Sequence, residues 1–133
     1  MSKIRKNNVQ QKKIKVPSEN NIELDYPIFC FRYLQTEPKG DFKFYSDFIQ
    51  RLKKLSSLTW NQINVAERHG FGTEKMPVKQ IKPQLPRFVT PEISHLLVLR
   101  ATGDNRPFLG LLNGIIFHII FIEEQFGDVY DHN

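Results

Sequence analysis

Residues 106–122 of this chain have the sequence RPFLGLLNGIIFHIIFI, a run dominated by apolar side chains. A helix that crosses a bilayer needs about 20 consecutive apolar residues, whereas the apolar part of this run is shorter and is interrupted by Asn113-Gly114 and His118. Asn-Gly is the preferred pair for a two-residue hairpin turn, because both turn residues must tolerate a positive φ. The stretch therefore predicts a β-hairpin and not a membrane span.

The position of the turn sets the register of this hairpin. With Asn113 and Gly114 as the turn residues, His118 is expected opposite Leu109. One face of the hairpin then carries Leu109, Leu111, Ile116, His118 and Ile120. The other face carries Phe108, Phe117, Ile119 and Phe121. Since the last strand has no polar member on this second face, we expect it to meet the helices.

A third strand is predicted just before the hairpin. Residues 94–101 have the β-favouring sequence SHLLVLRA, and TGDN at 102–105 is typical of a turn. If TGDN is a four-residue loop, Arg100 pairs with Pro107 and falls on the same face as His118, and a slip of one residue would reverse this. Residues 94–122 thus predict a three-stranded antiparallel meander.

The preceding part of the chain predicts two helices. Apolar residues recur at steps of three and four over 42–58, with lysines on the opposite side, which indicates an amphipathic helix with a basic outer face. Thr59 and Gln62 have the spacing of a capping box, so a second helix is expected from there to about residue 68. The run YPIFCFRYL at 26–34 suits an early strand, and EKMPV at 74–78 an edge strand. This order favours an α+β fold, with both helices on one face of the sheet.

The charge of the chain is concentrated at its beginning. The net charge of the chain is +5, and six of its positively charged residues precede the first acid, Glu19: Lys3, Arg5, Lys6, Lys12, Lys13 and Lys15. Residues 1–20 are expected to be a flexible basic tail that adds at most non-specific affinity for phosphates, and residues 21–133 a single domain. The last eleven residues are acidic, with Glu123, Glu124, Asp128 and Asp131.

The single cysteine, Cys30, excludes an internal disulfide and is compatible with a reducing cytoplasm. No signal peptide is visible, so a cytoplasmic location is expected. Phosphate-binding glycine loops, dinucleotide fingerprints and nucleophile elbows are absent from the sequence, and no cofactor is expected. The spacing of His118, Asp128, Asp131 and His132 matches no strong ligand pattern, so we predict no metal site.

Four polar residues border the hairpin. Arg100 and Arg106 flank the first turn of the meander, and the chain leaves the last strand at that same end toward Tyr130 and His132. Their convergence would suit phosphate chemistry, because guanidinium groups bind phosphate oxygens while His and Tyr exchange protons. RNA would supply its own nucleophile, the 2′-hydroxyl. A solvated turn and a frayed tail are the structural alternative.

Three further residues are candidates for RNA contact. His69 and Lys75 lie, together with Glu74, in RHGFGTEKM, a glycine-bearing loop that could approach a substrate, although a helix C-cap with an incidental histidine explains it at least equally well. His118 is the polar residue of the last strand, where a lone histidine is more often structural. No feature indicates specificity for DNA.

The element order, an early strand, two tightly joined helices and a meander that ends in Arg, Tyr and His, resembles the RelE-type toxins of bacterial toxin-antitoxin systems, over residues 31–132. The stretches FYSDFIQRLKKLSSLTWNQI, HGFGTEKMP, VLRATGDNRPFLGLL and GDVYDH are similar in pattern to small, poorly characterised bacterial and mobile-element proteins. The resemblance implies a small endoribonuclease acting on messenger RNA, without metal or cofactor, and an antitoxin as protein partner. It assigns Arg100 and Arg106 to the scissile phosphate, Tyr130 or His132 to proton transfer and Lys75 to the RNA backbone. The alternative is a non-catalytic interaction module of the same fold that binds a protein partner or RNA.

Overall fold

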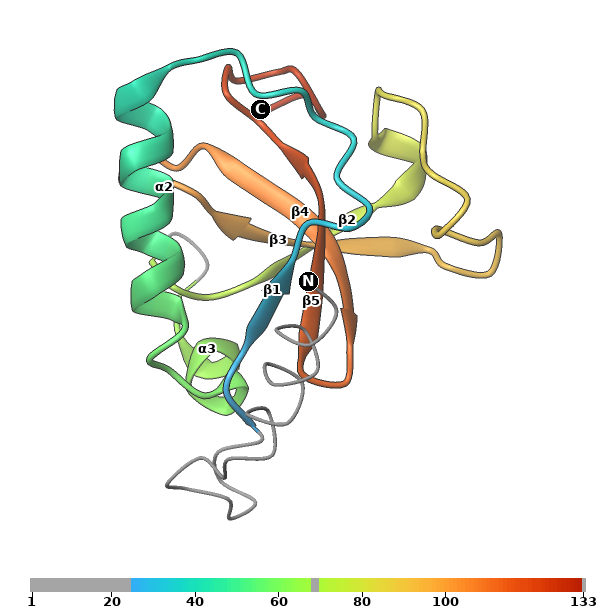
Figure 1. The fold of residues 1–133 in the computed structure, drawn as a ribbon. Helices are drawn as coiled ribbons and strands as arrows, with labels where there is room; N and C mark the ends of the chain where they lie inside the picture. Colours follow the sequence, from blue (N-terminus) through green and yellow to red (C-terminus); the bar gives the residue numbers. More distant parts are fainter. Residues whose placement is uncertain (1–24, 68–69, 133) are drawn as a thin grey trace, which may run out of the picture.

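The computed structural model describes residues 25–67 and 70–132. Along the chain they form β1 (Ile28–Cys30), α2 (Phe42–Leu55), α3 (Trp60–Val65), β2 (Glu74–Pro77), the 3₁₀ helix η2 (Val78–Gln80), β3 (His95–Arg100), β4 (Pro107–Asn113) and β5 (Ile116–Ile122) (Figure 1). The expectations for the tail at 1–20 and for His69 lie outside the described residues. None of the described helices combines the length and the apolar character that a membrane span requires.

The strands form one five-stranded sheet in the order β1-β5-β4-β3-β2. All neighbours are antiparallel except β1, which runs parallel to β5. The α+β class is confirmed, but the sheet is larger than the predicted meander, because β1 and β2 extend it at the two edges. The predicted edge strand at EKMPV is β2, which pairs with β3. Arg100 pairs with Pro107, as the four-residue loop predicted.

Local side-chain bonds set the ends of both helices. The Asp41 side chain caps α2, and Thr59 and Gln62 form the predicted capping box at α3. Ser56 and Ser57 donate hydroxyl hydrogen bonds to the carbonyls of Leu52 and Lys54. These bonds satisfy the last carbonyls of α2, which explains why the helix ends before residue 58.

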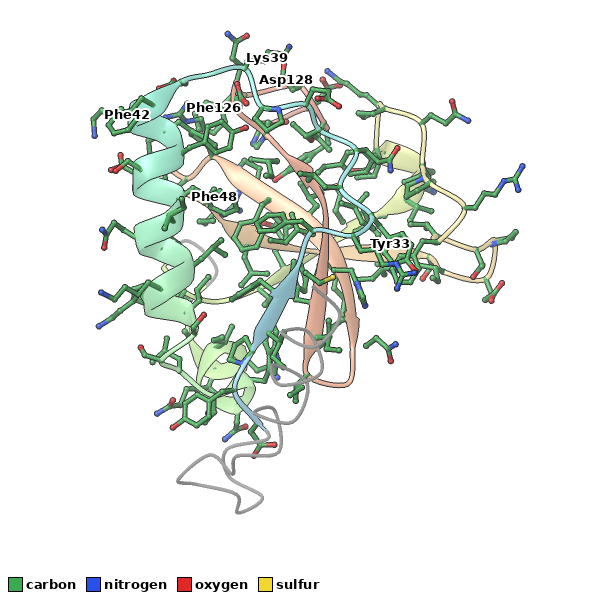
Figure 2. The ribbon with its side chains drawn as sticks, in the orientation of Figure 1. Tyr33, Lys39, Phe42, Phe48, Phe126 and Asp128 are labelled. Carbon is green, nitrogen blue, oxygen red and sulfur yellow. The ribbon has the colours of Figure 1, made fainter. Side chains whose placement is uncertain are left out.

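Both helices cover one face of the sheet, and Phe48 points from α2 toward it in Figure 2. We call the apolar core on this face the helix-side cluster: Phe44, Phe48, Leu55, Trp60, Ile63, Leu99, Ala101, Phe108, Phe117, Ile119 and Ile122. The opposite face carries the far-side cluster: Met76, Ile81, Leu96, Val98, Leu109, Ile120, Phe121, Val129 and Tyr130. Residues 78–89 and the C-terminal segment contribute to the far-side cluster or pack against it, and so does Tyr33, which follows β1.

The turn of the last hairpin consists of Gly114 and Ile115, because Asn113 pairs with Ile116. The prediction of Asn113-Gly114 is therefore wrong. Of the two turn residues only Gly114 has a positive φ, of 65°. This is the pattern of a type II′ turn, in which glycine takes the first central position.

The new turn moves His118 opposite Leu111 instead of Leu109. Since side chains alternate with a period of two, this shift keeps every residue near the turn on its predicted face. Phe117 and Ile119 accordingly pack on the helix side.

The alternation reverses at an irregularity in the β4–β5 pairing. Gly110 pairs with Ile119 whereas Leu109 pairs with Phe121, so β5 has one extra residue, Ile120, at this point. An extra residue of this kind is a β-bulge and shifts the following side chains to the other face. Phe121 consequently packs in the far-side cluster, and the expectation that it meets the helices is wrong.

Candidate functional site

Arg100 lies at the end of β3 on the far side of the sheet, with only 5% of its surface exposed. Its guanidinium forms an ion pair with Glu74 on β2, with 2.6 Å between Nη2 and Oε1. Nη1 donates to the carbonyl of Asn105 and, at 3.5 Å, to the hydroxyl of Tyr130. Nε is buried and has no partner among the described residues. Arg100 is therefore largely committed inside the protein, and its buried Nε–H is a donor without an acceptor in the described part of the chain.

Tyr130 and His132 continue this set of contacts toward the surface. Their rings stack with centroids 4.3 Å apart and planes inclined by 26°. His132 Nε2 hydrogen-bonds Oε1 of Glu123, whose side chain is fully buried. Burial raises the pKa of the Tyr130 hydroxyl, against the opposing effect of the Arg100 hydrogen bond and charge. We call Glu74, Arg100, Tyr130, His132 and Glu123 the far-side polar chain.

Glu123 also fixes the C-terminal segment to the sheet. Its Oε2 accepts the backbone N–H of Val129 at 2.7 Å and that of Tyr130 at 3.4 Å. A buried carboxylate that accepts several hydrogen bonds is well satisfied and orients the groups that donate to it. Glu123 is thus a buried residue that holds the C-terminal segment in place by hydrogen bonds.

Arg106 lies on the helix side of the sheet, apart from the other three predicted catalytic residues. Its guanidinium lies 4.4 Å from the centre of the Phe44 ring, pairs with Asp104 and donates to the carbonyl of Glu124. Arg106 and Ala101 close the loop between β3 and β4, and the side chain follows Ala101 onto the helix side. The structure therefore brings Arg100, Tyr130 and His132 together and leaves Arg106 outside their set of contacts.

The surroundings of Arg106 are poorly suited to phosphate. It lines a hollow of about 420 Å³ together with Lys39, Asp41, Glu124 and Asp128. Three carboxylates accompany two cations there, so the local charge does not favour an anion. Glu124 is buried and bonds the hydroxyl of Tyr45 on α2.

His118 packs beside two aromatic residues on the far side. Its ring lies 5.4 Å from that of Tyr33 and 4.9 Å from that of Phe88. Its Nδ1 is buried without a hydrogen-bond partner in the described part of the chain. Lys75 is exposed on β2 and belongs to neither set of contacts.

The sequence does not predict the contacts of Glu74 and Glu123 or the stacking of Tyr33 on Phe88. Glu74 is expected from the sequence to approach a substrate from its loop, whereas its pairing with Arg100 depends on β2 lying beside β3. Glu123 is, in the sequence, one of the four acids of the acidic end. The sequence does contain one signal for Glu123, which is its position directly after the apolar last strand. A carboxylate that is buried at such a position must be hydrogen-bonded or paired.

Among residues 25–67 and 70–132, no three His, Cys, Asp or Glu side chains are grouped so that they could hold a metal ion. What the far-side polar chain offers is a histidine oriented by a buried carboxylate, backed by a tyrosine and an arginine. Such an arrangement can accept and return a proton.

Comparisons of the chain with protein families, with curated proteins and with solved structures found no match.

Proposed function

We propose that this chain is an endoribonuclease that cleaves RNA through attack by the RNA's own 2′-hydroxyl, with His132 as the base. The observation that supports this is the far-side polar chain, in which three of the four residues expected from the sequence contact one another in series. Mutual contact is what proton-transfer chemistry requires of such residues. By analogy with the RelE-type toxins, an antitoxin is the expected protein partner.

His132 is the member placed to touch a substrate. Its side chain is 26% exposed, whereas Arg100 and Tyr130 are buried. Because Nε2 is bonded to a carboxylate, the tautomer with its hydrogen on Nε2 is favoured, and the lone pair then lies on Nδ1. Nδ1 takes the proton of the 2′-hydroxyl as the oxygen attacks phosphorus. The bond from phosphorus to the 5′-oxygen breaks, that oxygen takes a proton from water, and the hydroxide left behind takes the proton back from Nδ1. A 2′,3′-cyclic phosphate and a 5′-hydroxyl remain, and His132 is neutral again.

Arg100 and Tyr130 act as positioning residues in this scheme. The Tyr130 hydroxyl is protonated at neutral pH, since burial raises its pKa further above the ordinary value, and Arg100 donates to that hydroxyl. The stacked Tyr130 ring then fixes the plane of His132. The exposed cation of this region is Lys82, which pairs with Asp131 beside His132 and is suited to meet a phosphate.

The test is cleavage of a labelled single-stranded RNA by the purified full chain, in the presence of a metal chelator, with detection of cyclic phosphate ends. We expect His132→Ala to slow cleavage by a factor of about 100 or more, the usual contribution of a general base. His95→Ala is the matched control, because His95 is exposed at the opposite end of β3 and should leave the rate unchanged. Intact RNA after prolonged incubation with the wild-type protein would overturn the proposal.

A second candidate is a non-catalytic interaction module of the same fold. The observation that favours it is the state of the two arginines: Glu74 already neutralises Arg100, and Arg106 lies on the other side of the sheet. A module of this kind would bind RNA or a protein partner and leave it intact. In the same assay it would give stable RNA, and His132→Ala would change neither the RNA nor its binding.

A further inference from the structure

Two short turns on the far side of the sheet have the same design. In the first, the N–H of Leu34 bonds the carbonyl of Phe31, so that Arg32 and Tyr33 are its central residues. In the second, the N–H of Val89 bonds the carbonyl of Pro86, and the central residues are Arg87 and Phe88. Each turn therefore presents an arginine followed by an aromatic ring.

The two turns meet through their aromatic rings. Tyr33 and Phe88 stack face to face, with centroids 3.9 Å apart and planes inclined by 7°. The ring of His118 lies against the edges of the pair. Figure 2 shows Tyr33 on the side of the sheet away from α2. We call Arg32, Tyr33, Arg87, Phe88 and His118 the arginine–aromatic patch.

The charge of this patch is uncompensated. Arg32 and Arg87 are both exposed, and neither forms an ion pair with a residue in the described ranges. Each is the single charged residue of its segment, 26–36 and 83–91. Arg32 lies 5.8 Å from the centre of the Tyr33 ring, near enough for a cation–π contact. A polyanion would meet two cations here and no acid within either segment.

His118 provides a polar group beside the two rings. Nδ1 is buried and unpartnered, whereas Nε2 is neither buried nor hydrogen-bonded to a described residue. A nitrogen in this position can exchange a hydrogen bond with a ligand that covers the rings. Exposed cations that hold phosphates, partly exposed aromatic side chains beside them and a polar group are features by which proteins bind single strands.

We infer that the arginine–aromatic patch binds a single-stranded polynucleotide; the choice of RNA as that strand rests on the proposed function. Tyr33 and Phe88 pack against the same far-side cluster that contains Tyr130. The patch and the far-side polar chain therefore share one face of the sheet. A strand held at the patch would extend over that face, and its phosphates would approach His132.

The experiment measures the anisotropy of a labelled oligouridine of about ten nucleotides, within the range of single-strand sites, bound to the full chain at several salt concentrations. The 2′-hydroxyls are methylated so that the strand cannot be cleaved. For the double variant Arg32→Ala/Arg87→Ala we expect a Kd at least about tenfold higher, and a slope of log K against log salt reduced by about 1.4, which is about 0.7 for each phosphate contact that is lost. The control is Lys53→Ala/Lys54→Ala, which removes the same charge from exposed positions on α2.

A second variant tests the rings separately from the charges. Phe88→Leu keeps an apolar side chain and is expected to raise the Kd about tenfold, with an unchanged salt slope, because stacking involves no counterion release. A thermal melt of each variant checks that it is folded. The inference is overturned if both arginine removal and Phe88→Leu act no more strongly than the lysine control, or if a duplex of the same strand binds as tightly.

The outcome is separable from that of the proposed function. Binding that depends on the patch, combined with unmodified RNA left intact, would support the patch and refute the nuclease. Cleavage that depends on His132, with binding indifferent to the patch variants, would support the nuclease and refute the patch.

Discussion

The two faces of the sheet bury different charged side chains. The helix-side cluster is built around the rings of Phe108 and Phe117, which meet edge to face at 5.8 Å, and Glu124, which bonds Tyr45 on α2, is the charged side chain buried beside it. The far side buries Arg100 and Glu123 next to its apolar cluster. Burying a charge costs several kcal/mol even where it is paired, and apolar replacements of such pairs are often more stable. The comparison teaches that the far side carries a largely buried ion pair, Arg100 with Glu74, which stability alone does not demand, and both proposals lie there.

Gly110→Ala is expected to have the largest effect, because it acts where β5 changes the face of its side chains. A Cβ atom at Gly110 would lie 1.9 Å from the carbonyl oxygen of His118, which is backbone and cannot rotate away. Separating β4 from β5 would disturb both clusters, so we expect a loss of more than about 3 kcal/mol of unfolding free energy.

The measurement is chemical denaturation followed by circular dichroism. Gly103→Ala is the control, because no atom lies within 4 Å of the Cβ that it would add. If Gly110→Ala unfolds at the same denaturant concentration as the wild type, the close approach of the two strands is wrong.

The two arginines beside the first turn provide the next test of the comparison. Arg100→Met removes one partner of a largely buried ion pair and leaves Glu74, itself partly exposed, without that cation; we expect a loss of about 2–3 kcal/mol. Arg106→Met removes a cation–π contact with Phe44 and a partly exposed pair with Asp104, and about 1 kcal/mol is expected. Equal losses in a denaturation experiment would contradict the assignment of the two arginines to different environments.

Two consecutive glutamates directly after β5 make contacts on opposite faces of the sheet, so their variants compare the two faces at neighbouring positions. Glu123→Gln replaces an acceptor of the Val129 and Tyr130 N–H groups. We therefore expect the free energy needed to open the C-terminal segment locally to fall by about 1–2 kcal/mol. Limited proteolysis should then cut residues 125–132 faster. Glu124→Gln disturbs the contact with Tyr45 on α2 instead and should leave that rate unchanged. Faster cutting in both variants would show that the segment is not held by Glu123.

Much of the fold follows from local patterns in the sequence. The capping box of Thr59 and Gln62 and the pairing of Arg100 with Pro107 are confirmed, because turn and cap chemistry involve residues close in the chain. The faces of Phe117 and Ile119 are also confirmed, since strand alternation is a short-range property.

What the sequence missed depends on contacts between distant residues. The parallel pairing of β1 with β5 joins the first strand to the last, and no local signal specifies it. The bulge at Ile120 moved Phe121 to the far side by adding one residue. Arg106 lies on the helix side of the sheet because its carbonyl bonds the N–H of Ala101 and closes the loop there. Arg100 pairs with Glu74 because β2 pairs with β3. A candidate site assembled from chain order alone therefore contained one residue from the wrong environment.

The smallest expected effect is on the Tm at alkaline pH, and it compares Tyr45 on the helix side with Tyr130 on the far side. Burial, followed by the hydrogen bond to Glu124, raises the pKa of Tyr45 above its ordinary value near 10. A hydroxyl whose pKa is raised in the folded state stabilises the protein below pH 10, and this contribution is lost as the pH rises from about 10 toward the folded pKa, because only the unfolded chain releases the proton. The Tm of the wild type should therefore fall above about pH 10, and less steeply in Tyr45→Phe.

The pKa of Tyr130 is raised as well, but there the Arg100 hydrogen bond and charge oppose the effect of burial. Tyr130→Phe should accordingly flatten the alkaline decline of Tm less than Tyr45→Phe does. The measurement is a series of thermal melts from neutral pH to above pH 10 for the three proteins, in which lysines and the other tyrosines contribute equally. If Tyr130→Phe flattens the curve more, Arg100 does not reach the Tyr130 hydroxyl in solution, and the far-side polar chain is broken at that link.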